Sequence, residues 1–583
     1  MCGIFSILNN FDSFPFVFVA EQFQKGKNRG PEYSALSHIG LGITAGFHRL
    51  AINGLNPESN QPIVDDNISL ICNGEIYNYK ELYKQMDIQP KTQSDCEVII
   101  HLYRRYGIEH TLQMLDGVFA FVLLENSIAE DNTKVFVARD PYGVRPLYIL
   151  KPYKSRRPHK LPIYAFASEL KMLNEFCEKL NDDVNSGLDY EVKQFLPGSY
   201  SSYCLSDNLK VRWHPVHNRK KYHSTGFNSI MFYKEDEFTV STIAKNISNY
   251  LVRAVEKRCV TTERPIACLL SGGLDSSLIA ALVNQYHKMH DLPTLETYSI
   301  GLEGSEDLRY AKKVADYLGT KHTEILLTEQ DFLDAIPEVI YAIESYDTTS
   351  VRASIGNYLL GKYISQHSNA KVIFNGDGSD ELCGGYLYMS LAKECVEFDR
   401  EVRRLLSDIH LYDVLRSDKC ISSHGLEPRT PFLDRSFVQY YLSIPPQIRF
   451  HKVNHQCEKF LLRTAFSEKY YVNYENKPIL PLEVLWRRKE AFSDGVSVKT
   501  RSLYEIIQEH AVDKVAEMDM IGKYYGKHLD PTTDEQYYYR HLFESKYPGM
   551  GKIVPYFWMP KYLEGVTDPS ARTLDIYKEP DTS

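Results

Sequence analysis

The sequence of 583 residues has no long apolar run, no paired cysteine motif and no excess of basic charge. Its longest apolar stretches, FPFVFVA at 14–20 and the VFAFVLL run that ends at Leu124, are too short to span a bilayer. The amino terminus shows no basic segment followed by an apolar one, so we expect no signal peptide. These absences exclude the usual signatures of secretion and of membrane insertion.

The charge and the cysteines narrow the class of protein further. A formal net charge of -9 argues against a nucleic-acid backbone as the main partner, because such a partner usually requires a basic face. None of the 11 cysteines forms a C-x-x-C pair, and the count is odd. We therefore expect reduced thiols and a cytoplasmic protein. Small anionic ligands are not excluded, because local sites bind them on acidic proteins.

The length of the chain and the pattern of its apolar and polar residues predict two domains. Residues 1–205 contain many short β-branched and aromatic runs, which indicate a strand-dominated first domain. Residues 206–234 are polar, mixed in charge and without clear periodicity, so we expect a linker there. In 235–566, strands alternate with helices, a pattern typical of a parallel sheet covered on both faces. The polar tail at 567–583 is expected to fray.

The second residue of the chain is a candidate nucleophile. Removal of the initiator methionine, which a small second residue permits, leaves Cys2 with a free α-amine. The pKa of such an amine is about 7.7–8.0, so it can act as the base for the thiol of the same residue. The alternative is that Cys2 is only a small residue near a strand.

Other polar residues of the first domain suit the same chemistry. Acyl transfer from a carboxamide needs an oxyanion hole and a clamp for the amino-acid end of the substrate. Asn73 and Gly74 offer a side-chain amide and an unhindered N–H, and Arg49 suits an α-carboxylate. Glu75 and Asp95 suit an α-ammonium group. Each has a structural alternative, such as a turn, a surface arginine or a helix N-cap, but their combination behind a penultimate cysteine favours function.

Residues 1–205 resemble a class II glutamine amidotransferase domain, which is an N-terminal-nucleophile hydrolase with an αββα sandwich fold. The resemblance runs through MCGIF, FHRLAI, QPI, NGEIYN, SDCEVI, LDGVFAF, RDPYGVRPLY and FASE. It implies that Cys2 is the nucleophile, that Asn73 and the Gly74 N–H form the oxyanion hole, and that glutamine is bound by Arg49, Leu50, Asn73, Gly74, Glu75 and Asp95. Where the family usually has His-Arg-Gly-Pro-Asp, this chain has Asn28-Arg29-Gly30-Pro31-Glu32. We expect a tuned loop there, with the site intact.

Two glycine-rich segments of the second domain indicate a nucleotide site. SGGLDSS at 271–277 lies between an apolar strand and a helix, where backbone N–H groups and the helix dipole favour an anion. It lacks the Gly-Lys-Ser/Thr ending of a P-loop, and Asp275 suits Mg²⁺ between phosphate oxygens instead. NGDGSDE at 375–381 follows the strand KVIF, at the strand end where α/β folds bind ligands. There Asp380 would join Asp275 around Mg²⁺, and Asp377 would face the reacting carbonyl. The alternative for either segment is a turn without a ligand.

The second domain resembles the synthetase domain of the asparagine synthetase family, a parallel-sheet α/β fold of the ATP pyrophosphatase (adenine nucleotide α-hydrolase-like) type. Matching segments include CLLSGGLDSSLIAAL, SYDTTSVRAS, HGLEPRTPFLD, EKFLLR, LWRRKEAFSDGV and DPSART. The resemblance implies Lys459 at pyrophosphate, Asp275 and Asp380 at Mg²⁺, and a set of ATP-binding residues: Leu270, Ser271, Gly272, Gly273, Asp275, Ser276, Ile300, Asn375 and Gly376. The family often has Ser-Gly-Glu where this chain has Asn375-Gly376-Asp377, and often His-Lys-Ala-Pro where Tyr386 leads into LYMSLAK.

Together the two resemblances imply asparagine synthesis from aspartate, ATP and glutamine. Glutamine would supply ammonia, aspartate would react through an acyl adenylate, and glutamate, AMP and pyrophosphate would be released. Because water protonates most ammonia at neutral pH, we expect a mostly apolar tunnel between the domains. A homodimer is compatible with this interpretation. Three alternatives remain open at this point: an adenylating cyclase of the β-lactam synthetase type, an amidotransferase attached to a sugar or phosphoribosyl domain, and a catalytically inactive regulatory protein.

Overall fold

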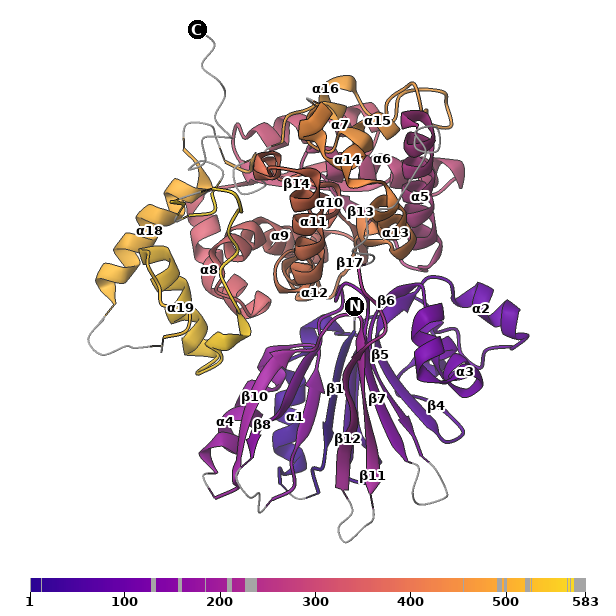
Figure 1. Ribbon diagram of the computed structural model, residues 1–583, viewed down its shortest axis with the longest axis vertical. Coiled ribbons are helices and arrows are strands. Elements are labelled where there is room, and N and C mark those ends of the chain that lie inside the picture. The colour runs from indigo at the N-terminus through magenta and orange to yellow at the C-terminus, as the bar shows by residue number, and fades with distance from the viewer. Residues whose placement is uncertain are drawn as a thin grey trace.

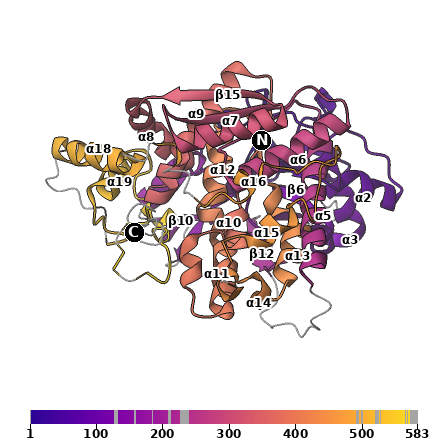
Figure 2. The same cartoon turned by 90° about the horizontal axis from the view of Figure 1, so that it is seen from above.

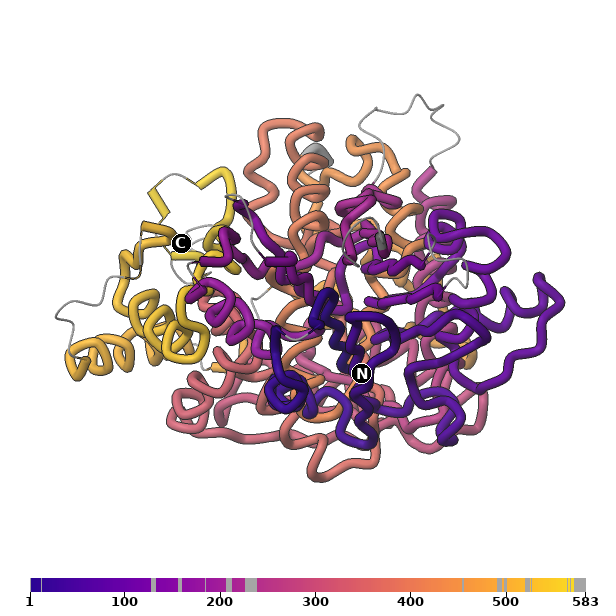
Figure 3. Tube along the Cα trace, turned by 90° about the horizontal axis from the view of Figure 1, so that it is seen from below, coloured from indigo at the N-terminus to yellow at the C-terminus, as the bar shows by residue number. Residues whose placement is uncertain are grey.

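The computed structural model describes the whole chain except residues 1, 12, 127–132, 156–159, 184, 207–211, 226–238, 455, 490–494, 498–500, 519–524, 526, 564, 567 and 571–583. Two lobes meet along an extended interface, and the amino terminus lies where they meet (Figure 1). Seen from above, α18 and α19 extend to one side and α2 and α3 lie on the other (Figure 2). Seen from below, the amino-terminal lobe faces the viewer (Figure 3).

The amino-terminal lobe contains two six-stranded antiparallel sheets. The first has the order β10 (Leu188–Gln194), β8 (Tyr148–Ser155), β9 (Tyr164–Ala167), β1 (Gly3–Leu8), β3 (Ile43–Arg49) and β2 (Tyr33–Gly40). The second has the order β12 (Arg212–Lys221), β11 (Ser199–Ser206), β7 (Lys134–Arg139), β6 (Gly117–Glu125), β5 (Ile68–Ile76) and β4 (Ile63–Asp65).

The two sheets face each other, and helices cover their outer faces. Alternate residues of each strand point inward, so Ile4 and Leu8 of β1 share an apolar layer with Ile71 of β5. On the outer face of the first sheet pack α1 (Phe16–Gln24) and α4 (Asn174–Asp182). On that of the second pack α2 (Tyr79–Met86) and α3 (Val98–Met114), which follows the short 3₁₀ helix η3 (Asp95–Glu97). This arrangement is the expected αββα sandwich.

The carboxyl-terminal lobe is built on one parallel sheet, as predicted from the alternation of strands and helices. Its order is β15 (Lys321–Leu327), β14 (Glu296–Leu302), β13 (Ile266–Leu269), β16 (Val372–Phe374) and β17 (Glu427–Arg429). One face packs against α5 (Val240–Val260), α6 (Leu274–Met289) and α7 (Glu306–Leu318). The other packs against α9 (Thr348–His367) and α12 (Asp413–Ser422).

The remaining helices surround this core. They are α8 (Glu329–Ile343), α10 (Ser379–Cys383), α11 (Cys395–Asp408), α13 (Arg435–Ser443), α14 (Pro446–Arg449), α15 (Phe460–Ala465), α16 (Leu482–Leu485), α18 (Leu503–Glu517) and α19 (Asp534–Lys546). Residues of α8, α18 and α19 share an apolar cluster with the outer face of the first sheet, so the cores of the two lobes are continuous. Within the described part of the chain, no helix is both long and apolar enough to cross a membrane.

Two predicted boundaries need correction. Much of the expected linker at 206–234 is strand β12, which forms the edge of the second sheet, while 226–234 lies outside the described residues. Edge strands commonly carry charged residues and proline, so RWHPVHNRKK shows no apolar alternation. At the other end, Asp568 forms an ion pair with Arg352 and Ser570 is buried. Within the expected tail at 567–583, Asp568 and Ser570 are therefore anchored, and 567 and 571–583 lie outside the described part.

Candidate active sites

Cys2 precedes β1, at the boundary between the lobes. Its nitrogen donates to Asn73 Oδ1 (3.2 Å), and its thiol lies 3.7 Å from the carbonyl oxygen of Leu50. Burial raises the pKa of the Cys2 thiol to about 11. A thiol that is so strongly held in its neutral form needs a base beside it to attack a carbonyl, and the α-amine of a processed Cys2 would be that base.

Asn73 on β5 holds its two amide atoms in different environments. Its Oδ1 accepts the hydrogen bond from Cys2, whereas its Nδ2 is buried and has no hydrogen-bond partner among the described residues. A buried donor without a partner is costly unless a ligand satisfies it. This Nδ2 is therefore placed to donate to an oxygen of a bound substrate.

Gly74 follows Asn73 on β5, and the strand geometry gives the direction of its N–H. Successive N–H groups alternate between the two edges of a strand. Those of Cys72 and Ile76 point away from β6, where they donate to Gln61 Oε1 (2.5 Å) and Asp95 Oδ2 (2.6 Å). The N–H of Gly74, two residues from each, points to the same edge. Asn73 and Gly74 thus each offer a donor, and their role as an oxyanion hole stays a prediction.

Arg49 ends β3 and is buried. Its guanidinium donates to the carbonyl oxygens of Gly54 and Asn56 (3.0 Å to Asn56) and to Asn60 Oδ1 (2.6 Å). These bonds tie down the loop that follows the strand. In this structure, the guanidinium that was predicted to clamp a carboxylate is bonded to loop oxygens.

Glu75 and Asp95 lie close to residues of the other lobe. Glu75 accepts from Asn53 Nδ2 (2.6 Å) and lies 3.4 Å from the guanidinium of Arg429 on β17. Burial, together with the charges of Glu427 and Asp95, raises the pKa of Glu75 well above its ordinary value. Burial also raises the pKa of Asp95 to about 6. Arg429, which the sequence interpretation did not single out, thus reaches the predicted glutamine site from the second domain.

The SGGLDSS segment forms the turn between β13 and α6. Ser276 Oγ accepts from the N–H of Ser271 (3.1 Å), and Gly273 is the N-cap of α6 without a side-chain cap. The first N–H groups of the helix are therefore available to an anion. Gly272 has φ of +73°, and a Cβ there would lie 2.5 Å from the nitrogen of Ala311. Gly272 lets the chain turn and does not line the pocket, unlike the other residues predicted to bind ATP.

The predicted adenosine residues line the same pocket as this loop. Leu270 and Ile300 lie at neighbouring strands, and the N–H of Leu270 donates to the carbonyl oxygen of Tyr298 (2.8 Å). A Cβ on Gly376 would lie 2.8 Å from the Cβ of Asp275, so only glycine lets the two loops approach this closely. Neighbouring strand ends therefore bring both predicted loops together, as the sequence indicated.

Two aspartates and two lysines form the charged centre of the pocket. Lys459 Nζ lies 2.5 Å from both Asp275 Oδ2 and Asp380 Oδ1, and Lys489 Nζ lies 2.6 Å from Asp380 Oδ2. Burial opposes ionisation of Asp380, but the two lysines hold its pKa below the ordinary range. Two carboxylates that share one ammonium group are close enough to share a divalent cation. The described residues contain no group of three or more His, Cys, Asp or Glu that could hold a metal ion.

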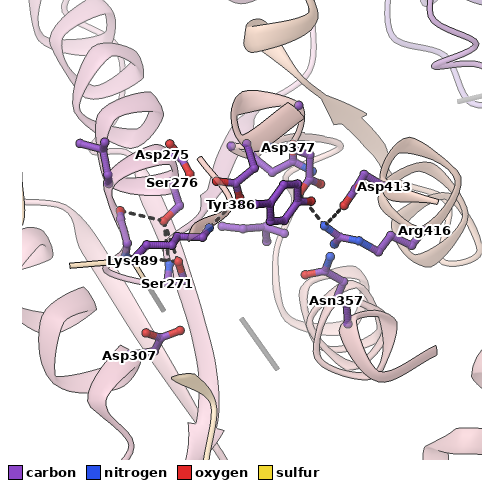
Figure 4. A pocket seen from close by; sticks show the side chains of 18 of the residues that line it. Ser271, Asp275, Ser276, Asp307, Asn357, Asp377, Tyr386, Asp413, Arg416 and Lys489 are labelled. Carbon is purple, nitrogen blue, oxygen red and sulfur yellow. Dashed lines mark hydrogen bonds and ion pairs between the residues drawn. The ribbon is translucent and has the colours of Figure 1, made fainter. Parts of the chain in front are cut away.

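The opposite side of the pocket carries Asp377 and a partly buried arginine of α12. Arg416 Nη2 lies 3.4 Å from Asp377 Oδ1 and 2.8 Å from Asp413 Oδ1. Tyr386, whose hydroxyl donates to Glu381 Oε1 (2.5 Å), lies between this group and the phosphate loop (Figure 4). Burial raises the pKa of Asp377. Asp377 thus faces the pocket as predicted, beside a cation that the sequence did not identify.

Several pocket residues were missed from the sequence. They are Thr349 and Arg352 on α9, Arg416 on α12, and Lys489. Arg352 is paired with Glu535 and with both oxygens of Asp568 (2.9 and 2.7 Å). Each lies in or near a segment that resembles the family, but a single arginine or lysine in such a segment shows no role until the fold places it in a pocket.

The fold and the two sites define a class of protein. A half-buried cysteine with two candidate oxyanion donors, joined in one chain to a parallel-sheet domain with a glycine-rich loop before a helix, is the arrangement of a glutamine amidotransferase fused to an ATP-dependent synthetase domain.

Comparisons with known proteins agree with this class. The family described as glutamine amidotransferase domain matches residues 1–203, and that described as asparagine synthase matches 246–398 and 391–555. The chain is 40% identical over 593 residues to the glutamine-hydrolyzing asparagine synthetases of Rattus norvegicus and Homo sapiens, and 39% identical over 602 residues to that of Gallus gallus. Each alignment covers 99% of both chains. The chain belongs to the glutamine-hydrolysing asparagine synthetase family.

Proposed function

We propose that this protein makes L-asparagine from L-aspartate, with ATP as the activating substrate and L-glutamine as the nitrogen donor. The observation that carries the proposal is that one chain holds both complete sets of residues, on either side of a shared interface. The intact group of Cys2, Asn73 and Gly74 disfavours a cyclase with a decayed glutaminase half. The phosphate loop disfavours a sugar or phosphoribosyl partner domain. Neither site supports an inactive regulatory protein.

In the glutaminase site, the thiol of Cys2 attacks the side-chain amide carbon of glutamine. The α-amine takes the thiol proton and passes it to the departing ammonia, and water then hydrolyses the thioester to glutamate. Asn73 Nδ2 and the N–H of Gly74 donate to the oxygen that becomes negative in the tetrahedral intermediate. Arg49, Asp95 and Glu75 bind the charged amino-acid end of glutamine, and Leu50 lines the site beside the thiol.

In the synthetase site, a carboxylate of aspartate attacks the α-phosphate of ATP, and pyrophosphate leaves. Ammonia then attacks the acyl carbon of the adenylate, and AMP leaves. Ser271, Gly273 and Ser276 hold the phosphates, and Lys459 and Lys489 neutralise the departing pyrophosphate. Leu270, Ile300, Asn375 and Gly376 surround the adenosine. Asp377 faces the acyl carbon from the side of the pocket where Arg416 lies.

Asp275 and Asp380 fit a bound Mg²⁺. Both carboxylates already reach one cationic nitrogen, that of Lys459, and Mg²⁺ commonly takes only one or two protein carboxylates together with substrate phosphates. When bound, the ion would offset phosphate charge that repels an incoming carboxylate. For Mg²⁺ to take the place of the Lys459 ammonium group between the two carboxylates, Lys459 would move to the pyrophosphate.

The remaining parts of the proposal concern the whole protein. The interface contains apolar residues, among them Leu50, Ile52 and Val144, which share one cluster with the second lobe. It also contains buried ion pairs such as Arg145 with Asp418. A passage for ammonia between the two sites would be lined by these apolar residues and buried ion pairs. All 11 cysteines are unpaired, which supports a cytoplasmic location. A homodimer stays a prediction.

A pair of variants tests the two-site scheme. Cys2→Ala should abolish glutamine-dependent asparagine synthesis and leave ammonia-dependent synthesis intact, because only the first site uses the thiol. Asp380→Ala should abolish AMP formation with either nitrogen donor. Loss of both activities in Cys2→Ala, or full activity in Asp380→Ala, would contradict the proposal.

A further inference from the structure

A loop of the second lobe packs against the predicted glutamine site of the first. The loop at 261–264 connects α5 to β13, and we call it the docking loop. It faces the segment 51–54, which directly follows Arg49 and Leu50 and which we call the glutamine loop. Neither segment was assigned a role in contact between the domains on sequence grounds.

Hydrogen bonds connect the two loops at every position of the glutamine loop. The carbonyl of Ala51 accepts from Arg264 Nε (2.8 Å), and that of Ile52 accepts from the N–H of Glu263 (3.0 Å). Asn53 Nδ2 donates to the carbonyl of Thr261 (3.1 Å). The N–H of Gly54 donates to Glu263 Oε1 (2.6 Å). A backbone segment bonded at each residue has little freedom to rearrange alone.

A second contact joins the same arginine to Glu32. Arg264 Nη2 lies 2.8 Å from Glu32 Oε1, and Glu32 Oε2 accepts from the N–H of Ala51 (2.7 Å). Glu32 stands where related glutaminase domains usually have aspartate, and its extra methylene extends the carboxylate toward the other lobe. Both ends of the carboxylate are thus used, one on the glutamine loop and one on the docking loop.

The glutamine loop in turn fixes parts of the glutaminase site. The carbonyl of Gly54 accepts from the guanidinium of Arg49, and the carbonyl of Leu50 faces the thiol of Cys2. Asn53 also donates to Glu75. Gly54 has φ of +62°, and a Cβ there would lie 2.4 Å from Ser59 Oγ, so the loop has one permitted path. Moving the glutamine loop would therefore displace the residues proposed to hold the substrate.

We propose that Glu263 and Arg264 are positioning residues of the glutaminase reaction, supplied by the synthetase domain. They act through the glutamine loop: Glu263 fixes Gly54 and Ile52, and Arg264 fixes Ala51 together with Glu32. The glutamine site is thus completed across the interface, and its affinity for glutamine depends on docking of the second domain. This inference rests on the proposed function of Cys2 and Arg49.

Two substitutions in the full-length chain test the role. Glu263→Gln weakens a charged acceptor and Arg264→Met removes two donors. Each should raise the KM for glutamine about tenfold or more, measured by glutamate release, because each weakens or removes charge-assisted bonds to the loop. Ammonia-dependent synthesis should change by less than about twofold, since the synthetase pocket is not touched. Arg501→Met, at a partly exposed ion pair with Glu329, is the matched control and should leave both activities unchanged.

A charge exchange separates positioning from general structural support. Arg264→Glu alone should raise the KM for glutamine, and combining it with Glu32→Arg should recover part of the loss, because the exchange restores the ion pair but not the two bonds to Ala51. An unchanged KM in the single variants would overturn the proposal. So would an equal loss of glutamine- and ammonia-dependent synthesis, which indicates a damaged fold. If the unmodified chain makes no asparagine from ammonia, the proposed function fails, while glutamate release still tests the positioning role.

Discussion

The chain differs from its family at Asp377, where the family often has glutamate. Of the differences noted, this one lies nearest to the proposed reaction. Its Oδ1 faces Arg416 at 3.4 Å, and its Oδ2 is buried without a hydrogen-bond partner among the residues that the structure describes. A shorter side chain at this position keeps the carboxylate but withdraws it toward the backbone. This buried oxygen lacks a partner among the described residues, and the substrate complex would supply one.

The reach of this carboxylate leads to a prediction. Asp377→Glu adds one methylene and should keep ammonia-dependent synthesis within about threefold of the unmodified rate, or raise it, because the resembling family often has glutamate at this position. Steady-state asparagine formation with saturating ammonia measures the effect. A complete loss would mean that the surrounding pocket is shaped for aspartate.

The pKa of Asp95 makes glutamine binding depend on pH. The proposed partner of Asp95 is the ammonium group of glutamine, which it binds only when it is ionised. Burial raises the pKa of Asp95 to about 6, so its ionised fraction falls as the pH drops through that value. The KM for glutamine should therefore be constant above about pH 7 and rise about tenfold per unit below pH 6.

Initial rates of glutamate release between pH 5 and 8 check this dependence. In Asp95→Asn the KM should be high throughout and lose the inflection near pH 6. Asp183→Asn, at an exposed pair with Lys160, is the control and should keep the profile of the unmodified chain. An Asp95→Asn profile identical to that control would contradict the assignment.

At single positions, sequence alone located the groups whose chemistry is intrinsic to the residue type in its motif. The structure brings Cys2 and Asn73 together, with Gly74 next on the same strand, and it places Asp275 in the lining of the pocket of the second lobe. Residues such as Arg429 and Lys489 were missed because their role depends on long-range packing: β17 brings one to Glu75, and the second pairs with Asp380. The partner of a lysine or an arginine is set by the fold and is not visible in the sequence.

Helix α12 is the element that touches both proposed sites. Ser417 accepts from Asn375 Nδ2 (2.7 Å) on the side of the nucleotide pocket. Asp418 lies 2.8 Å from the guanidinium of Arg29, in the loop that resembles the family's Arg-Gly-Pro motif. Arg145 lies 3.5 Å from the same carboxylate. These side chains are buried, so α12 holds the interface by charges that water does not screen.

Removing the charge at this helix should destabilise the whole chain. Asp418→Asn leaves two buried arginines with less compensation and should cost about 3–5 kcal/mol in the free energy of unfolding. Urea or thermal unfolding measures the change. Asp316→Asn, at an exposed pair with Lys312, should stay within about 0.5 kcal/mol. A wild-type stability for Asp418→Asn would show that the interface does not depend on this ion pair.

Among the elements, long periodic segments were predictable and charged edges were not. The strand and the helix expected on either side of SGGLDSS are β13 and α6. Strand β12 was taken for a linker because its side chains are largely exposed at the edge of a sheet. Periodicity reports burial on one face, so an element with no buried face leaves no such signal.

At the scale of the molecule, the two lobes do not stand as separate units. Two apolar clusters and several buried ion pairs run across the interface, and the docking loop reaches the glutamine site. The two resemblances in the sequence predicted both folds but not the contacts between the lobes. Those contacts join segments that are distant in the chain, and neither set of motifs specifies them. A protein built this way is suited to generate ammonia and use it within one chain.

Product analysis shows whether one chain releases an amide nitrogen and places it on an acid activated by AMP. The purified protein is incubated with glutamine, ATP, aspartate and Mg²⁺, and every product is quantified. If both sites act as proposed, asparagine, AMP and pyrophosphate should appear in equal amounts, with at least as much glutamate. Formation of ADP and phosphate in place of AMP and pyrophosphate, or of asparagine without glutamate, would contradict it.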